Sequence, residues 1–378
     1  MVQGLPRAVR VLAAAVLLVL AFVCGAVPLG ADSAVPEGGA DVPTAIAVAD
    51  TAGQAAPPAV VAQTPGPQAL LPSARHQYQT LNNCGPATAA MVAEFFGHRV
   101  SQEAARQALR PGGYDDKNVR PEELASYLAG FGLEARVRAA GSIDRLRVLL
   151  ANGIPVIVDQ VLTSEASHND VGHFAFVRGY DDAAGVLVTQ DPYYGPARRL
   201  SYAEFDRLWR AFNRRYIPVY QPQDALLVQA ILGEDWDELA NWARAQHLVE
   251  EEINRAPHDP YAWFNLGDSH LGQGDAGTAS HAYERALALG LPGKQLWYQV
   301  GPIAAHNRTG NYRRALELAQ RALATEATLT EVHYERGVAL LGLGQRGAAL
   351  EAFRQAARYG PTYAPAHEMV AQLSAPAR

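Results

Sequence analysis

Cysteine is scarce in this sequence. The 378 residues include two cysteines, Cys24 and Cys84, and Cys24 lies inside an apolar N-terminal run. The rest of the chain therefore cannot build a disulfide framework, and it offers no C-x-x-C pair or second cysteine for thiol redox chemistry. Any chemistry that needs a thiol depends on Cys84 alone.

Charge is also sparse, and neither sign dominates. Charged residues make up 19% of the chain and hydrophobic residues 49%, which is typical of a soluble globular protein. The formal net charge is -6 and no long basic run is present, so we exclude nucleic acid as a partner. The length exceeds the roughly 100–200 residues of one ordinary domain, so we expect two globular units and a tail.

The N-terminus has the layout of a secretory signal. Arg7 and Arg10 precede an apolar run from Val11 to Leu29, and small residues follow. The run is close to the roughly 20 residues that span a bilayer, so an uncleaved membrane anchor is the alternative. Residues 1–31 are thus predicted to be a signal peptide or an anchor, and the protein to be secreted or held outside the cell membrane.

A spacer and two folded regions are expected after this segment. Residues 32–71 are rich in Ala, Pro, Val, Gln and Gly and show no sustained period, which predicts a flexible linker. Residues 72–222 combine helical and strand patterns and are expected to form the first domain. Residues 226–373 show helical repeats throughout and are expected to form the second.

Cys84 is expected at the start of a helix. A short helical pattern covers residues 88–96 and stops at Gly97, and Pro86 fits the first helical turn, where its missing N–H costs nothing. The partial positive charge of a helix start lowers the pKa of a thiol, and the thiolate is the nucleophile. A lone cysteine is more often inert and buried, so this placement matters only together with a base.

A base and an orienting group are predicted on the strands that follow. Residues 154–161, 172–180 and 186–191 have strand patterns, and turn residues separate the last two. His173 would begin one strand and Asp191 would end the next, so a tight hairpin would bring them to the same end of the sheet. A nucleophile needs an adjacent base, and the base needs an orienting third group.

Three separated motifs carry a resemblance to a known family. They are Gln79…Asn83-Cys84-Gly85-Pro86, Gly172-His173-Phe174…Gly179-Tyr180-Asp181 and Gln190-Asp191-Pro192…Gly195. In order and context they resemble the papain-like cysteine peptidases related to the bacteriocin-processing double-glycine peptidases. The resemblance implies an α+β fold with N-terminal helices and an antiparallel sheet.

The same resemblance implies the roles of four residues. Cys84 would be the nucleophile, His173 the general base, Asp191 the group that orients the imidazole, and Gln79 the side chain that donates to the oxyanion. Gln77 stays an alternative to Gln79, because residues two apart in a strand point the same way. The family's transporter-linked members cut leader peptides, but this chain has no ATP-binding P-loop, so that substrate is not implied.

No metal or cofactor is predicted. His168 and Asp170 lie near His173 in the sequence, but no second histidine stands at helical spacing as in H-E-x-x-H. The catalytic groups implied above need neither a metal nor a bound cofactor. We therefore expect a hydrolase that works with side chains alone.

The second half resembles tetratricopeptide repeats. One copy has its signature at Trp263, Gly267, His270, Ala279, Tyr283, Ala286 and Pro292. The pattern recurs in residues 333–361, less cleanly in 297–322 and weakly in 226–257, which predicts about four repeats. Stacked repeats form a solenoid whose concave face can bind a protein partner, with Asn265, Asp268 and His306 as candidate polar contacts.

Two functions follow from these expectations. The first is an extracytoplasmic cysteine peptidase that hydrolyses a protein or peptide through Cys84, His173 and Asp191, with repeats that recruit proteins. The alternative is a non-catalytic adaptor, in which a peptidase-like fold binds peptides and the repeats act as a scaffold. Loss of a catalytic residue would favour the adaptor, and the sequence shows no such loss.

Overall fold

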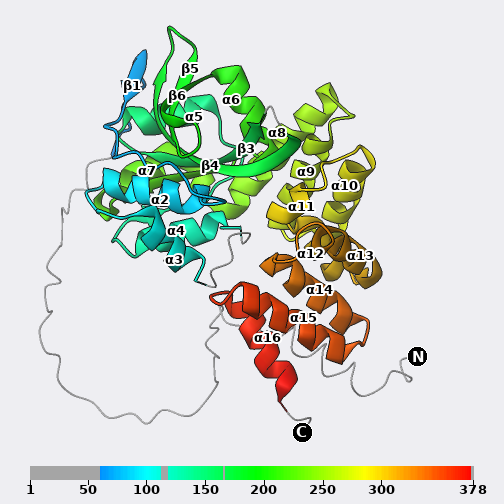
Figure 1. Cartoon of the computed structure of the whole chain (residues 1–378). Helices are drawn as coiled ribbons and strands as arrows, with labels where there is room; N and C mark the ends of the chain where they lie inside the picture. Colours follow the sequence, from blue (N-terminus) through cyan, green and yellow to red (C-terminus); the bar gives the residue numbers. More distant parts are fainter. Residues whose placement is uncertain (1–59, 112–117, 165–166, 376–378) are drawn as a thin grey trace, which may run out of the picture. The chain divides into compact units, whose positions relative to one another are not determined.

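Two kinds of architecture follow one another along the chain (Figure 1). The computed structural model describes residues 60–111, 118–164 and 167–375. Within this part, residues 68–220 contain the strands and are called the sheet domain, and residues 225–374 are helices joined by turns and are called the repeat domain. Both lie in one compact unit, residues 58–378. This arrangement confirms the predicted α+β domain followed by an all-α solenoid.

The sheet domain is built on one seven-stranded antiparallel sheet. Its order is β2-β7-β3-β4-β5-β6, and β1 pairs with β4 outside this path. The strands are β1 (Gln68–Leu70), β2 (Glu134–Ala135), β3 (Val156–Ser164), β4 (Ser167–Asp181), β5 (Val186–Asp191), β6 (Gly195–Ser201) and β7 (Tyr216–Tyr220). The long strands β3 and β4 form the centre, and β4 carries His173.

Helices cover both faces of this sheet. Figure 1 shows α2, α3 and α4 on one side of the strands and α5 and α6 on the other. These helices are α2 (Cys84–Phe95), α3 (Gln102–Leu109), α4 (Pro121–Ala129), α5 (Ile143–Ala151) and α6 (Tyr202–Trp209), followed by the 3-10 turn η1 (Arg210–Phe212). A sheet buried on both faces needs apolar residues at successive strand positions, which explains the continuous apolar runs of β3 and β4.

Alternate residues of the central strands pack into two separate cores. Val158 of β3 pairs with Ala175 of β4, and both lie in the core under α5 and α6. Their neighbours Ile157 and Phe176 also pair, and both lie in the core under α2 and α4. The period of two along each strand thus divides the side chains between the faces, and it fixes which residues reach Cys84.

The repeat domain consists of helices stacked in chain order, from α9 to α16 in Figure 1. Its elements are η2 (Pro222–Asp224), α7 (Ala225–Leu232), η3 (Gly233–Trp236), α8 (Glu238–Arg255), α9 (Pro260–Gly272), α10 (Ala276–Ala288), α11 (Gln295–Tyr298), α12 (Gly301–Arg308), α13 (Tyr312–Leu323), α14 (Thr330–Gly342), α15 (Arg346–Tyr359) and α16 (Ala364–Ser374).

A glycine–aromatic contact holds the helix pairs of two repeats together. A Cβ on Gly267 of α9 would lie 2.5 Å from the Tyr283 ring of α10, and a Cβ on Gly337 of α14 would lie 2.6 Å from the Phe353 ring of α15. Only glycine leaves room for the ring at each crossing. The small residues of the sequence pattern are therefore explained by close helix packing.

The repeat between these two is interrupted. Its first helix is split into the four-residue α11 and the separate α12, and Gln299 between them is extended, with φ -136° and ψ 99°. Pro302 explains the break, because proline lacks the N–H for an interior helical bond and its ring clashes with the carbonyl four residues earlier, here that of Tyr298. The interruption leaves Trp297 and Tyr298 at the C-terminal end of the short α11.

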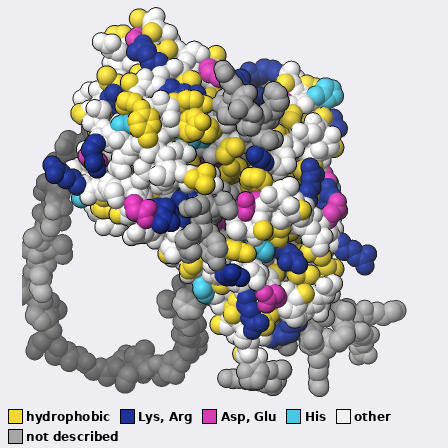
Figure 2. All heavy atoms as spheres, viewed as in Figure 1, with side chains coloured by type: hydrophobic (Ala, Val, Ile, Leu, Met, Phe, Trp, Pro, Cys, Tyr) yellow, Lys and Arg dark blue, Asp and Glu magenta, His cyan; other side chains and the backbone are white. Residues whose placement is uncertain are grey.

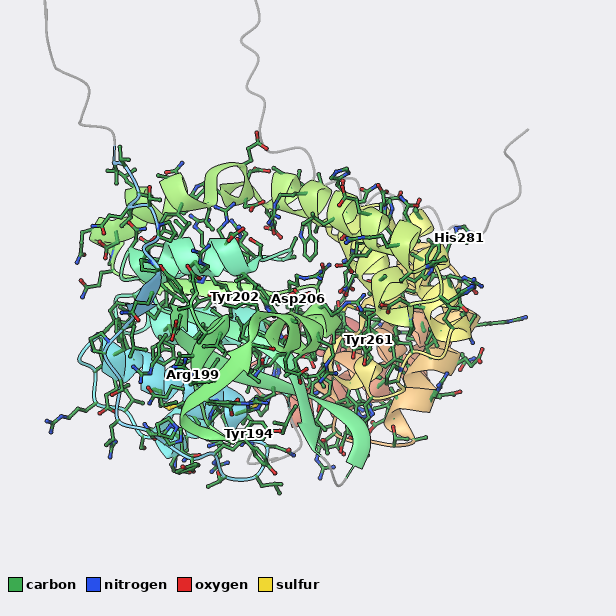
Figure 3. The ribbon with its side chains drawn as sticks, turned by 90° about the horizontal axis from the view of Figure 1, so that it is seen from above. Tyr194, Arg199, Tyr202, Asp206, Tyr261 and His281 are labelled. Atoms are coloured by element: carbon green, nitrogen blue, oxygen red, sulfur yellow. The ribbon has the colours of Figure 1, made fainter. Side chains whose placement is uncertain are left out.

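The hydrophobic core continues from the sheet domain into the repeat domain. Val228, Ile231 and Leu232 of α7 are buried in the same cluster as the α5 and α6 side of the sheet. Tyr261 of α9 and Tyr298 of α11 pack against that cluster; Tyr261 is labelled in Figure 3. The two domains therefore share apolar packing as well as polar contacts.

Two sequence-based expectations need correction. Residues 68–70, assigned to the flexible linker 32–71, form β1 and pair with Gly179–Asp181 of β4. Three residues are too few to show a periodic pattern, so the strand depends on its partner rather than on its own sequence. The linker therefore overlaps the sheet at its C-terminal end, while the other domain limits stay predictions.

The predicted location outside the cell membrane is contradicted. Among the residues described above, no helix is long and apolar enough to cross a membrane. The segment 1–31, on which the signal or anchor was predicted, lies outside those residues. Basic residues followed by an apolar run and then by small residues are a compositional signal alone. The function proposed below therefore names no location.

Candidate active site

The loop before Cys84 is held rigidly by side chains from α3 and its C-terminus. Asn82 adopts a left-handed conformation with φ 51°, and its carbonyl accepts from Arg110 Nη1 at 2.9 Å. The fully buried Asn83 side chain accepts from Arg110 Nη2 at 2.7 Å and donates to Gln102 Oε1 at 2.8 Å. These bonds fix the turn that places Cys84 at the first position of α2, as the sequence predicts.

His173 and Asp191 form a buried pair at the end of the β4–β5 hairpin. The distance from His173 Nε2 to Asp191 Oδ1 is 2.9 Å, and the exposed fractions of the two side chains are 1% and 0%. The same Oδ1 accepts from the backbone N–H groups of Tyr193 and Tyr194 at 2.9 and 3.1 Å. With its Nε2 side fixed by Asp191, the imidazole can present only Nδ1 to a reactant.

Arg198 also holds Asp191, and the sequence analysis did not find it. Its Nη1 donates to Asp191 Oδ2 at 3.0 Å, and its guanidinium lies 3.7 Å above the ring of Tyr194. Tyr194, labelled in Figure 3, lies in the turn between β5 and β6. No sequence motif marks Arg198, because it reaches Asp191 only through the pairing of these strands.

Cys84 and His173 perturb each other's protonation. Burial alone would raise the pKa of the Cys84 thiol, but hydrogen bonding with His173, its positive charge and the backbone of Phe174 and Gly85 outweigh burial, so the pKa is lowered. Burial lowers the pKa of His173, but the charge and hydrogen bond of Asp191, followed by Cys84, raise it to about 9. Each group therefore favours the charged form of the other.

The second ring nitrogen of His173, Nδ1, is the one left for Cys84. His173 Nδ1 is buried and has no hydrogen bond of ordinary geometry. Catalytic hydrogen bonds are often long or poorly aligned without substrate and shorten in the reacting complex. Nδ1 is therefore available to Cys84 and has no competing partner among the described residues.

The two glutamines before Cys84 have different environments. Gln77 donates from Nε2 to the Val100 carbonyl at 2.8 Å and accepts from the Gln102 N–H at 2.7 Å, so both ends of its amide are used in the fold. The backbone N–H of Gln79 donates to the Pro192 carbonyl, next to Asp191, at 2.8 Å. Its Oε1 is buried without a partner. Because the Nε2 donor of Gln77 is already used, Gln79 is favoured for the oxyanion role, which remains a prediction.

A cavity of about 270 Å³ opens beside Cys84, and both domains line it. From the sheet domain come Asn82, Cys84, Gly85, Asn118, Val119, Arg120, Pro121, Asp159, Val171, Gly172, Phe174 and Phe212. From the repeat domain come Lys294, Trp297, Tyr298, Val300, Glu326 and Glu331. The sequence analysis gave the repeats a recruiting role and did not find this shared wall.

Asp159 is a second acidic residue of the site that the sequence analysis missed. It lies on β3 and lines the cavity, and its Oδ2 accepts from Arg215 Nη1 at 3.1 Å. Burial raises its pKa to about 7, and Arg215 only partly opposes this shift. A charged residue inside the apolar run of residues 154–161 is the signal that could have found it.

The polar residues predicted to bind a partner on the repeats are engaged inside the molecule. Asn265 is fully buried and donates from Nδ2 to the carbonyl of Arg210 in the sheet domain at 2.7 Å. Asp268 accepts from the hydroxyl of Tyr283 at 2.7 Å, and His306 Nε2 pairs with Glu284 Oε1 at 2.8 Å. At Asn265, the repeat face is covered by the sheet domain itself.

Among the described residues, no group of three or more His, Cys, Asp or Glu side chains is arranged to hold a metal ion. The side chains of His168 and Asp170 lie outside the described part. On the face seen in Figure 2, Lys, Arg, Asp and Glu side chains are scattered without a field of one sign.

Cys84 begins a helix, and His173 lies on a strand beside Asp191. The sheet that carries this pair is antiparallel and covered by helices, which is the arrangement of papain-like cysteine peptidase folds. Comparison with family models agrees. Residues 67–217 match the model of the peptidase C39-like family, and residues 260–289 match a tetratricopeptide repeat model. Curated protein sequences give no match.

Solved structures similar to this chain include peptidase domains and MamA. A double-glycine-motif protease of an AMS/PCAT transporter, in complex with its leader peptide, has 19% identity; the match covers 40% of this chain and 94% of that one, with a TM-score of 0.32. The peptidase domain of Streptococcus ComA has 20% identity, 39% and 98% coverage and a TM-score of 0.31. A MamA RS-1 variant has 20% identity, 35% and 74% coverage and a TM-score of 0.33. At these scores we draw no functional argument from them.

Proposed function

We propose that this protein is a cysteine peptidase that hydrolyses a peptide bond through Cys84, His173 and Asp191. The observation that carries the proposal is the buried His173–Asp191 pair beside a cysteine whose pKa is lowered. A structural cysteine needs neither a base nor an orienting carboxylate, whereas a nucleophilic cysteine needs both. The peptidase C39-like match to residues 67–217 supports the same reading.

The reaction follows from these positions. The Cys84 thiolate attacks the peptide carbonyl carbon, and the carbonyl electron pair moves to the oxygen. Gln79 and the Cys84 backbone N–H, which has no partner within the helix because it is the first residue of α2, would donate to this oxyanion. The oxyanion collapses, the C–N bond breaks, and the proton from His173 Nδ1 goes to the leaving amine.

Water completes the cycle. His173, now neutral, takes a proton from water as the oxygen attacks the thioester carbon. The C–S bond breaks, the acid product leaves, and Cys84 and His173 return to the thiolate–imidazolium form. Asp191 keeps the imidazole in place and stabilises its positive charge throughout, as the orienting carboxylate of a triad does.

The direct test is alkylation of Cys84 by iodoacetamide over a pH series, together with hydrolysis of a peptide library. We expect Cys84 to react well below the free-thiol pKa of about 8.5 and to lose this reactivity in His173→Ala. His306→Ala is a matched control, because it removes a buried histidine paired with a carboxylate in the repeat domain. If Cys84 is not alkylated, or is alkylated equally well in His173→Ala, the proposed peptidase is wrong. The protein is then better described as a peptide-binding adaptor.

A further inference from the structure

The interrupted repeat is fastened to the sheet domain by buried amides. Gln295 and Gln299, both nearly fully buried, each donate from Nε2 to the Ala211 carbonyl, at 2.8 and 3.3 Å. From the other side, Asn118 Nδ2 donates to the Trp297 carbonyl at 2.5 Å. These three hydrogen bonds therefore fix the segment from Lys294 to Val300 at the wall of the cavity.

Tyr298 reaches the residue next to the predicted base. A Cβ on Gly172 would lie 2.8 Å from Tyr298 Cδ1 and 3.1 Å from Phe212 Cζ, so the ring occupies the space that a side chain at position 172 would need. Tyr298 also hydrogen-bonds with the Gly172 backbone, and burial, followed by the nearby Cys84, raises the pKa of its hydroxyl, which stays neutral. A repeat residue is thus in direct contact with the strand that carries His173.

The cavity that this segment lines has an apolar wall, and two of its acidic groups are paired with arginines. Its apolar wall consists of Val119, Val171, Phe174, Phe212, Trp297 and Tyr298. Its acidic groups face basic ones: Asp159 pairs with Arg215 at 3.1 Å and Glu331 with Arg120 at 3.1 Å. Lys294 and Glu326 add one charge of each sign. Such a site favours burial of an uncharged, apolar side chain.

We propose that the segment Lys294–Val300 forms a specificity wall of the substrate cleft, in which Trp297 and Tyr298 select a large apolar side chain adjacent to the scissile bond. The proposal rests on the proposed peptidase function and names its substrate class: peptides with an aliphatic or aromatic residue at a position flanking the cleaved bond. The repeat domain thereby contributes side chains that bind the substrate next to the bond that is cleaved.

The test measures kcat/KM for internally quenched peptides in which each position flanking the scissile bond is varied among Leu, Phe, Ala, Asp and Lys. We expect the full chain to prefer Leu or Phe over Ala by at least about tenfold at one position, as expected for several buried methylene groups. We expect Trp297→Ala to reduce this ratio to about threefold or less. A ratio between two peptides on one variant does not depend on the active fraction, so partial unfolding cannot imitate the effect.

Two further variants sharpen the result. Val300→Phe narrows the cavity from the same wall, and we expect it to shift the preference toward Ala. Trp263→Ala removes a half-buried tryptophan of the repeat domain that does not line the cavity, and we expect the wild-type ratio. Equal ratios in the wild type, Trp297→Ala and Val300→Phe would overturn the proposal, as would a wild-type preference for Asp or Lys.

The proposed function can fail separately. If iodoacetamide finds no activated Cys84 and no peptide is cleaved, the peptidase is wrong. The wall is then tested by peptide dissociation constants on the Cys84→Ala chain. A preference for Leu or Phe over Ala that is lost in the Cys84→Ala, Trp297→Ala double variant supports the wall for a binding protein, and its absence overturns it.

Discussion

The sheet domain and the repeat domain each contain a buried histidine beside a carboxylate. Different groups surround the two carboxylates. His173 meets Asp191 at 2.9 Å, and His306 meets Glu284 at 2.8 Å. Around Asp191 stand two backbone N–H groups and Arg198, and around Glu284 stands Arg314, which binds both its oxygens. Among the described residues, a thiol lies next to the first pair and not the second.

The comparison teaches that a histidine–carboxylate pair is not by itself a catalytic sign. Glu284 lies partly at the surface and joins two helices of successive repeats, α10 and α12, through His306. Asp191 is fully buried, and hydrogen bonds from three sides fix it. What separates a structural pair from a reactive one is the preorganised carboxylate and the adjacent nucleophile, which a sequence motif cannot display.

The largest expected effect comes from removing each histidine in turn. His173→Ala should lower kcat/KM by at least about 1,000-fold, because the base and the proton donor are lost together. His306→Ala should leave kcat/KM within about threefold and lower the free energy of unfolding by about 1–3 kcal/mol. Peptide hydrolysis and urea unfolding measure the two. Comparable losses of activity would show that neither pair is catalytic.

The two glutamines before Cys84 provide the next contrast. Gln79→Ala should lower kcat by about 100- to 1,000-fold at unchanged stability, since one oxyanion donor would be lost. Gln77→Ala should instead lower the free energy of unfolding by about 1–3 kcal/mol, because two hydrogen bonds to the fold disappear. Single-turnover kinetics and urea unfolding distinguish the cases. If the effects are exchanged, Gln77 is the oxyanion donor.

A pH profile of activity tests whether Asp191 raises the pKa of His173. Activity should rise as Cys84 loses its proton and fall as His173 loses its own near pH 9. In Asp191→Asn the main interaction that raises the pKa of His173 is weakened, so the alkaline limb should move toward the ordinary histidine value of about 6.5. The activity lost at pH 8 should exceed tenfold (about 1.4 kcal/mol per tenfold). An unmoved limb would show that Asp191 does not set this pKa.

The same shifts predict how stability follows pH. The pKa of His173 is raised on folding, so its contribution is complete below about pH 6.5 and is lost as the pH rises through about 9. The pKa of Asp191 is lowered to about 2, so its contribution is present above about pH 4 and is lost as the pH falls toward 2. Urea unfolding between pH 7 and 10 should show the first loss in the wild type and not in His173→Ala.

The smallest expected effects separate two kinds of glycine in the repeats. Gly267→Ala places a Cβ 2.5 Å from the Tyr283 ring and should cost about 1–3 kcal/mol. Gly347→Ala meets nothing within 4 Å on α15 and should stabilise the chain by up to about 1 kcal/mol, through helix propensity. Thermal unfolding measures both. Equal effects would mean that the helix crossing at Gly267 can relax.

The sequence was sufficient for those parts of the fold that local patterns encode. Pro86 and the apolar run after it predicted a helix beginning near Cys84, and the alternating residues around His173 predicted a strand. The contact between His173 and Asp191 followed from strand order alone. In contrast, Arg198 and Arg215 reach their carboxylates through pairing between strands, which no local period reveals.

The least regular repeat also held information that the sequence analysis did not use. The sequence analysis describes residues 297–322 as a less clean copy of the repeat, whereas the structure shows a broken helix at the cavity. A deviation from a repeat consensus is ambiguous in one sequence, because drift and a functional contact look the same. Only the partner surface, here Gly172 and Phe212, distinguishes them.

The apolar cluster shared by α7 and the sheet has a consequence for cooperativity. Val228, Ile231 and Leu232 belong to the core that also holds Trp209 and Tyr216. Melting of the first repeat helices would expose that core, so the two domains are expected to unfold together in a single calorimetric transition. A chain cut after residue 222 would lack part of its own interior, so we expect the sheet domain to need α7 in order to fold stably.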